Sequence, residues 1–206
     1  MTAFPQHAGF VPLPWTGLRI LLAAFLNRDL NRQPRPASRG VHDLLRKRDP
    51  DAWREVFQEE HAAIYRYAAG RLGPGVEAED ATSQVFEEAW EHAATFDDHG
   101  LPVRAWLFGI ARNVVNGHRR RLLQRPPALA LEDHDRPADD PGLDPEHLDL
   151  LKAVRSLESS WAEVVTLRFV HGLSLHETAA ALELSVDAVK GKQARALAQL
   201  RKSLRH

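Results

Sequence analysis

The chain has 206 residues, of which 44% are hydrophobic and 27% are charged, enough for one sizeable folded domain or two small ones. It contains no cysteine, which excludes disulfide bonds, thiolate metal sites and cysteine nucleophiles from this chain. Its formal net charge is −1, but the charges are unevenly distributed along the chain: residues 1–48 and 148–206 are net basic, and residues 49–147 are net acidic. The longest apolar run, residues 20–26, is far shorter than the roughly 20 residues that span a bilayer, and no small-residue cleavage site follows it. We therefore expect a cytoplasmic protein without a transmembrane segment.

Residues 1–48 are predicted to form an N-terminal extension that is partly disordered. Five prolines lie within residues 1–40, where they flank one amphipathic stretch at about residues 15–30. This stretch predicts one short helix on a basic arm. Several roles stay open for it: docking on the protein's own domains, on a partner or on a membrane surface, or no role at all, as in a dispensable or mis-started terminus.

Three helices are predicted between residues 49 and 123. Asp49 followed by Pro50 is a typical helix start, and the sequence Gly73-Pro74-Gly75 ends that helix. Apolar residues then recur at helical spacing from about residue 77 to 94, and again from about residue 102 to the arginines at 119–121. Three helices with such apolar stripes can bury one core as a bundle.

Residues 124–145 differ in composition from the segments on either side. They contain five prolines, and residues 122–147 carry seven acidic side chains against two basic ones. Such a segment has too few large apolar residues to bury a core, so it predicts a flexible acidic linker. Its acids would repel DNA, and we hypothesise that they imitate DNA inside a basic channel.

Residues 146–206 are predicted to hold a helix-turn-helix. Ser174 with Glu177 three residues later forms a capping box, and Ser185 opens another helix eleven positions after Ser174. This interval leaves room for one short helix and a tight turn. The second helix is basic, since six basic and no acidic residues follow Asp187. The predicted fold is therefore all-α, with a three-to-four-helix domain and a helix-turn-helix domain joined by the flexible acidic linker.

Four segments resemble motifs of bacterial sigma factors. Residues 79–86, Glu-Asp-Ala-Thr-Ser-Gln-Val-Phe, with Trp90 after them, resemble the polymerase-binding helix of that family. Residues 105–113, Ala-Trp-Leu-Phe-Gly-Ile-Ala-Arg-Asn, followed by an arginine run, resemble its promoter-melting helix. Residues 164–174 and 195–201 resemble the two ends of its fourth domain. Two such domains with no domain between them are the layout of the extracytoplasmic-function (ECF) branch, and the resemblance covers about residues 50–204.

The resemblance implies a sigma factor, which binds core RNA polymerase and directs promoter-specific transcription initiation. Residues 49–123 would then be sigma domain 2, which binds the β′ coiled coil and melts the −10 element. Residues 146–206 would be sigma domain 4, which binds the β flap and the −35 element. The resemblance also implies an anti-sigma partner, no small-molecule substrate and no reaction of its own.

The resemblance assigns polymerase contacts to an acidic helix face and −10 contacts to the next helix and the loop before it. Opposite charge steers association and sets register more than it adds affinity, and an ordinary solvated helix face is the alternative for these acids. Arginines hold phosphates without sequence preference, whereas strand separation also needs a surface on which an unpaired base stacks. Trp106 is expected in the core instead, because it lies at helical spacing with Ile110. The expected polymerase contacts are Glu79, Asp80, Gln84, Glu87 and Glu88, and the expected −10 contacts are Phe96, His99, Arg112, Asn113, Arg119, Arg120 and Arg121.

In the last helix, a rotation of 100° per residue separates an apolar face from a face of small and charged residues. Small residues at the centre allow close approach to a major groove, and long cations at the edges reach phosphates. Gly191 fits this arrangement, although a helix that merely tolerates a glycine is an alternative. The inward residues are Val189, Ala196, Leu197 and Leu200. The expected −35 contacts are Ser185, Asp187, Lys190, Gly191, Lys192 and Arg195, with Arg168 and Lys202 as further phosphate contacts.

Three positions depart from the pattern of the family. Glu183 stands in the helix-turn-helix turn where relatives usually have glycine, and a positive φ there would cost about 1 kcal/mol. Gly117 stands where relatives often have an acid. Lys-Gly-Lys-Gln at 190–193 lies on the reading face, so the promoter sequence cannot be taken from relatives.

Two other functions remain as alternatives. A helix-turn-helix regulator that does not bind core polymerase would explain residues 173–197, but not the acidic helix or the arginine-ended helix before the linker. An enzyme is disfavoured, because His171 and His176 lack a third metal ligand at any usual spacing and the chain has no His-Glu-x-x-His. We expect no catalytic residue, no metal site and no cofactor.

Overall fold

The computed structural model describes residues 39–96, 102–124, 153–154 and 156–203. All regular structure within these ranges is helical, which confirms the all-α fold class. The predicted helix at about residues 15–30, residues 125–145 of the predicted linker and His99 lie outside the described residues, whereas Gln124 lies in a helix. In the described ranges, no helix is both long and apolar enough to cross a bilayer.

The first group of helices begins one helix earlier than predicted. It consists of α2 (Arg39–Arg46), α3 (Pro50–Leu72), α4 (Val76–His92), the 3-10 helix η1 (Ala93–Thr95) and α5 (Val103–Gln124). We expected residues 39–46 in the extension, but α2 packs on the bundle through Leu45. This side chain is fully buried, and its backbone carbonyl accepts a hydrogen bond from Trp53 Nε1 at 3.1 Å.

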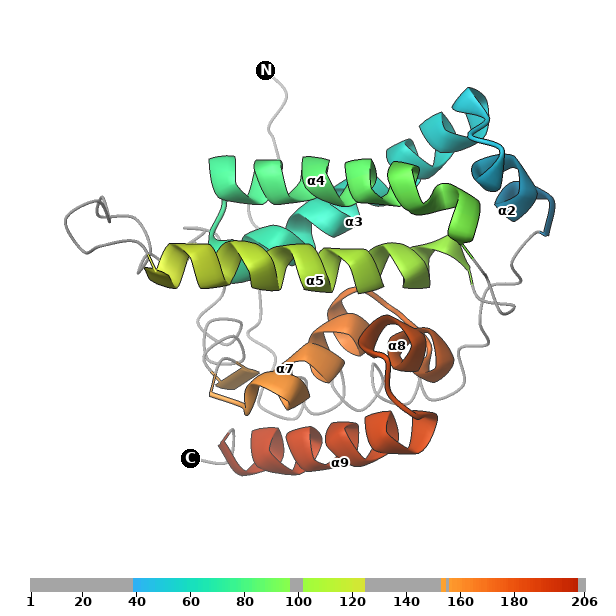
Figure 1. Ribbon diagram of the computed structural model, residues 1–206. Coiled ribbons are helices and arrows are strands. Elements are labelled where there is room, and N and C mark those ends of the chain that lie inside the picture. The colour runs from blue at the N-terminus through green and yellow to red at the C-terminus, as the bar shows by residue number, and fades with distance from the viewer. Residues whose placement is uncertain (1–38, 97–101, 125–152, 155, 204–206) are drawn as a thin grey trace, which may run out of the picture. The chain divides into compact units, whose positions relative to one another are not determined.

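α3 starts and ends where the sequence indicates. The Oδ1 atom of Asp49 accepts hydrogen bonds from the backbone nitrogens of Asp51 and Ala52 at 3.1 and 2.9 Å, and Pro50 begins the first turn. The helix stops at Gly73, where φ is 88° and favours glycine. α4 and α5 run alongside each other and pack on α3 (Figure 1), so the three predicted apolar stripes meet in one core.

The second group contains α7 (Ser159–Val165), the π-helix η3 (Thr166–Val170), α8 (Leu175–Leu182) and α9 (Val186–Ser203). The predicted capping box is confirmed: Ser174 Oγ accepts from the Glu177 nitrogen at 3.2 Å, and the Glu177 carboxylate accepts from the Ser174 nitrogen. α8, the turn at Glu183 and α9 form the predicted helix-turn-helix.

The two groups of helices share part of their core. Gly109 of α5 lies so close to α8 that a Cβ there would stand 3.6 Å from the carbonyl oxygen of Ala181. Tyr67 of α3 is buried and donates a hydrogen bond to Glu163 of α7 at 2.8 Å. Burial raises the pKa of the Tyr67 phenol, so the group stays a donor. Besides the close approach at Gly109, apolar packing holds α5 and α8 together.

Glu183 has the left-handed conformation expected of the turn, with φ 55° and ψ 41°. We predict that Glu183→Gly raises the free energy of unfolding by about 1 kcal/mol, because glycine adopts this conformation without a Cβ clash. Urea unfolding would measure the change. Glu183→Ala is the matched control: it removes the carboxylate but keeps Cβ, so an equal gain from alanine would contradict the conformational explanation.

Candidate functional site

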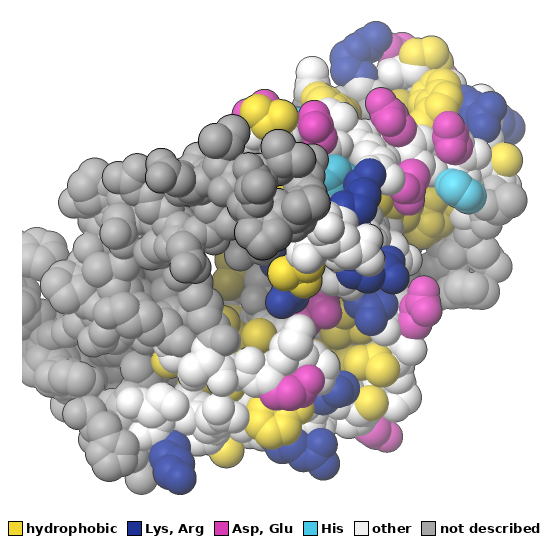
Figure 2. Space-filling model, turned by 60° about the vertical axis from the view of Figure 1, so that its left-hand side comes forward, with side chains coloured by type: hydrophobic (Ala, Val, Ile, Leu, Met, Phe, Trp, Pro, Cys, Tyr) yellow, Lys and Arg dark blue, Asp and Glu magenta, His cyan; other side chains and the backbone are white. Residues whose placement is uncertain are grey.

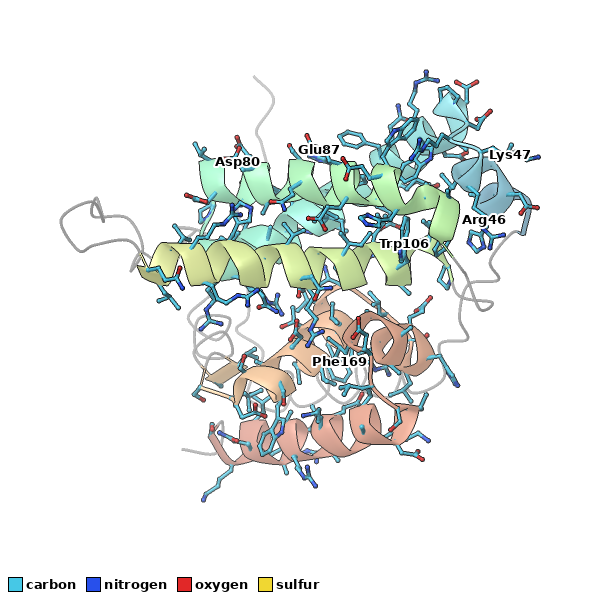
Figure 3. The ribbon with its side chains drawn as sticks, viewed as in Figure 1. Arg46, Lys47, Asp80, Glu87, Trp106 and Phe169 are labelled. Carbon is cyan, nitrogen blue, oxygen red and sulfur yellow. The ribbon has the colours of Figure 1, made fainter. Side chains whose placement is uncertain are left out.

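The α4 helix presents its acids to solvent along a groove shared with α5. Glu79, Asp80 and Glu87 are exposed, with Glu79 outside the lining of the groove, and Gln84 and Glu88 are half-buried. The apolar residues between them are buried. Figure 3 labels Asp80 and Glu87 on this helix, and Figure 2 shows acidic side chains near the top of one face with basic side chains grouped below them. The groove has a volume of about 540 Å³, and we call it the acidic groove. It is lined by Asp80, Ser83, Gln84, Glu87, Glu88, Glu91, His118 and Arg121.

His118 is a site residue that the sequence did not reveal. It is buried on α5, with Nδ1 3.2 Å from Glu77 Oε2 and Nε2 3.0 Å from Gln84 Oε1. Gln84 Nε2 in turn donates to Glu88 Oε1 at 2.8 Å. In the sequence, His118 stands directly before three arginines and has no feature that separates it from that basic run.

A second groove lies on another side of α5 and is basic. Arg112, Asn113, Arg119 and Arg120 line it together with Asn116 and Leu123, and its volume is also about 540 Å³. We call it the basic groove. Four of the expected −10 contacts are therefore brought together, whereas Arg121 lies apart in the acidic groove. Arg112 is half-buried, and its Nε stands 3.7 Å from a carboxylate oxygen of Glu163.

Phe96 does not offer the exposed stacking surface that we expected. Its side chain is buried and stacks on Trp106, with ring centroids 4.4 Å apart and planes at 27°. His42 of α2 packs edge-on against the Phe96 ring, with centroids 5.1 Å apart, and Arg46 Nε donates to the Phe96 carbonyl at 2.7 Å. Trp106 is half-buried against the core, as predicted. A base could reach Phe96 only after this aromatic packing opens.

The α9 helix separates its two faces largely as predicted. Val189, Ala196 and Leu200 are buried, and Leu197 is half-buried. Ser185 Oγ accepts from the Ala188 nitrogen at 3.1 Å and caps the helix. Asp187, Lys190 and Arg195 are exposed, and a Cβ on Gly191 would meet no heavy atom within 4 Å. Lys192 lies to one side, where its Nζ donates to Ser160 Oγ at 2.7 Å.

Two residues that we placed at the DNA surface lie in the interior. Gln193 is buried, so the reading face contains only part of the 190–193 segment. Arg168 is 1% exposed and cannot reach a phosphate. Its Nε donates to Gln193 Oε1 at 3.0 Å, and its Nη1 donates to the Leu173 carbonyl at 2.6 Å. These bonds explain how a charge is accommodated inside the helix-turn-helix.

The described side chains give no group of three His, Cys, Asp or Glu arranged to hold a metal ion. What they offer is two charged grooves on the first group of helices and one open helix face on the second. Opposite charges on adjacent helices suit recognition of a protein on one surface and a polyanion on the other.

Two sequence families match this chain. Sigma-70 region 2 matches residues 56–125, and Sigma-70 region 4 matches residues 153–202. The first match covers α3 to α5 and the second covers α7 to α9, so the matched segments follow the two groups of helices.

Several known proteins are similar over most of the chain. It is 36% identical over 162 residues to ECF RNA polymerase sigma factor BldN of Streptomyces coelicolor, covering 76% of this chain and 61% of BldN. It is 32% identical over 165 residues to ECF RNA polymerase sigma factor SigD of Mycobacterium tuberculosis, covering 74% of this chain and 77% of SigD. The alignment thus spans less than two thirds of BldN.

Two solved structures share the fold. CnrH in complex with the cytosolic domain of CnrY has a TM-score of 0.60 at 25% identity, covering 80% of this chain and 94% of that one. The sigma factor RpoE in complex with the anti-sigma factor NepR from Bartonella quintana has a TM-score of 0.57 at 25% identity, covering 74% of this chain and 96% of that one.

Proposed function

This chain belongs to the ECF family of bacterial RNA polymerase sigma factors, and we propose that it binds core RNA polymerase and directs promoter-specific transcription initiation. One observation carries the proposal: region 2 and region 4 match in the family's order, each on its own group of helices. A helix-turn-helix regulator that does not bind polymerase would account for region 4 alone. As a sigma factor, the chain would act in the cytoplasm, where polymerase and DNA are, and would catalyse no reaction.

The acidic groove is the proposed polymerase surface. Exposed Asp80 and Glu87, with half-buried Gln84, meet the β′ coiled coil, and sigma domain 4 meets the β flap. The sign of the charge fits a basic partner, whose approach it would steer. In this assignment, residues 39–124, with α2 included, act as sigma domain 2, residues 125–145 as the linker and residues 146–206 as sigma domain 4. Residues 1–38 are an extension of open role.

The basic groove is the proposed −10 surface, and the open face of α9 is the proposed −35 surface. Arg119 and Arg120 are exposed at the end of α5, where they can hold phosphates. On α9, the empty space over Gly191 permits close approach to a major groove, with Lys190 beside it. Since RpoE of Bartonella quintana was solved with an anti-sigma factor, we also propose an anti-sigma partner for this chain.

Run-off transcription with purified core polymerase on a pool of genomic fragments tests this function. The full chain should produce discrete transcripts that core polymerase alone does not, and their start sites should share two sequence elements. Folded protein that supports no initiation above core alone would overturn the proposal.

A double variant separates the DNA surface from the polymerase surface when its affinities for promoter DNA and for core polymerase are each measured. Arg119→Ala with Arg120→Ala should lower promoter affinity roughly tenfold or more and reduce the salt slope by about two, because two phosphate contacts are lost. Affinity for core polymerase should stay as in the unmodified chain. A loss of core affinity with unchanged salt slope would contradict the assignment of the basic groove to DNA.

A further inference from the structure

His118 links the two helices that form the acidic groove. Its ring lies between Glu77 and Gln84 of α4, and Gln84 continues the chain of hydrogen bonds to Glu88. We call these four residues the His118 relay. His118 is only 7% exposed, although it belongs to the lining of the groove together with Gln84 and Glu88.

The relay fixes which way the Gln84 amide points. A Glu88 carboxylate accepts hydrogen bonds and donates none, so the amide nitrogen of Gln84 turns toward it and the amide oxygen turns toward His118. His118 Nε2 is then the donor to Gln84. The opposite amide orientation would place the Gln84 oxygen against the carboxylate, with both atoms acceptors.

The geometry of α5 holds the imidazole in place. Val114 and Val115, one turn before His118, are both buried in the core. On its far side, Nδ1 lies 3.2 Å from the Glu77 carboxylate, which accepts hydrogen bonds, so in this arrangement both ring nitrogens carry a hydrogen and donate. Gln84 therefore has a fixed support beneath it, and it keeps one amide hydrogen and one oxygen lone pair for a partner in the groove.

From these contacts we infer that His118 is a positioning residue for polymerase binding: it holds Gln84 in its binding conformation before core polymerase arrives. This inference rests on the proposed function of the acidic groove. A glutamine side chain that must be ordered during binding weakens affinity, and ordering it beforehand is worth roughly 3- to 10-fold in Kd. His118 itself need not touch polymerase.

A double-mutant cycle on affinity for core polymerase tests the inference. His118→Phe keeps a ring of similar size but removes both nitrogens, and Gln84→Ala removes the side chain that is positioned. We expect His118→Phe to raise the Kd 3- to 10-fold in the unmodified background and less than 2-fold in the Gln84→Ala background. Equal effects of His118→Phe in both backgrounds would overturn the inference.

Rescue distinguishes positioning from mere packing. His118→Gln supplies an amide N–H that can reach Gln84, so its Kd should return to within about 2-fold of the unmodified chain, although it packs worse than phenylalanine. A His118→Gln variant as weak as His118→Phe would count against the inference. Thermal unfolding of each variant is measured in parallel, and His118→Asn, polar but too short to reach Gln84, replaces His118→Phe if that variant does not fold.

Glu59→Gln is the control variant, because Glu59 is exposed on α3 and lines neither groove. It should leave the Kd unchanged and combine additively with Gln84→Ala. The outcomes separate the two proposals: an unmodified chain that fails to bind core polymerase overturns the function itself. A chain that binds normally but is indifferent to Gln84→Ala overturns the role of His118 and the assignment of Gln84 to the polymerase surface, and it leaves the function itself standing.

Discussion

Arg168→Ala is expected to lower the free energy of unfolding by about 3 kcal/mol. The guanidinium is buried and donates to the Leu173 carbonyl at 2.6 Å and to Gln193 at 3.0 Å. Truncation leaves two buried acceptors without these donors, each worth about 1–3 kcal/mol, and it also opens a cavity beneath α9. Urea unfolding followed by circular dichroism would measure the loss.

Two comparisons make this prediction specific to the buried arginine. Arg201→Ala removes an exposed arginine of α9 and should change stability by no more than about 0.5 kcal/mol. Arg168→Met combined with Gln193→Leu removes donor and acceptor together, and it should recover at least half of the loss, since the Gln193 acceptor is no longer left buried without its donor. If Arg168→Ala is as stable as Arg201→Ala, the buried network does not hold the helix-turn-helix together.

Helix ends were predictable from the sequence because their signals are local. The caps at Asp49 and Ser174 lie within three residues of the groups they bind, so the residues that decide them are adjacent in the chain. The apolar face of α9 was equally predictable from its period. α2 was missed, because its burial depends on contacts with α3 and η1 that no eight-residue pattern contains.

Side chains whose partners are distant in the chain were placed poorly. Gln193 was assigned to the DNA face, but its partner Arg168 lies 25 residues away and draws it inward. Phe96 follows α4 in the chain, yet it packs on Trp106 of α5 and His42 of α2. His118 was hidden for the same reason, since Gln84 is 34 residues earlier. The polarity of a side chain therefore predicts its exposure only where the fold brings no buried partner to it from a distant part of the chain.

His171 is a buried histidine whose surroundings oppose its protonation. Its ring packs against Tyr67 and Phe108, with centroids 5.7 and 4.9 Å away. Burial, and then the positive charges of Arg71, Arg104 and Arg66, lower its pKa from the usual 6.5 to about 3. Arg104 also donates to the His171 backbone carbonyl at 2.9 Å and pairs with Glu60 at 2.8 Å.

This depressed pKa predicts a specific loss of stability in mild acid. Between pH 6.5 and about pH 3, the unfolded chain binds a proton at His171 that the folded protein does not bind. The histidine's contribution is thus complete above pH 6.5 and is lost as the pH falls toward 3. The expected loss between pH 7 and pH 4.5 is roughly 2–3 kcal/mol, measured by urea unfolding at each pH.

His171→Phe isolates this contribution from that of the other ionisable groups. Phenylalanine keeps an aromatic ring against Tyr67 and Phe108 but has no proton to bind, so its stability should fall by roughly 2 kcal/mol less over the same pH interval. His176→Phe, at an exposed position on α8, should retain the dependence of the unmodified chain. Parallel curves for His171→Phe and the unmodified chain would mean that the folded protein binds a proton at His171 as readily as the unfolded chain does, which would contradict the prediction.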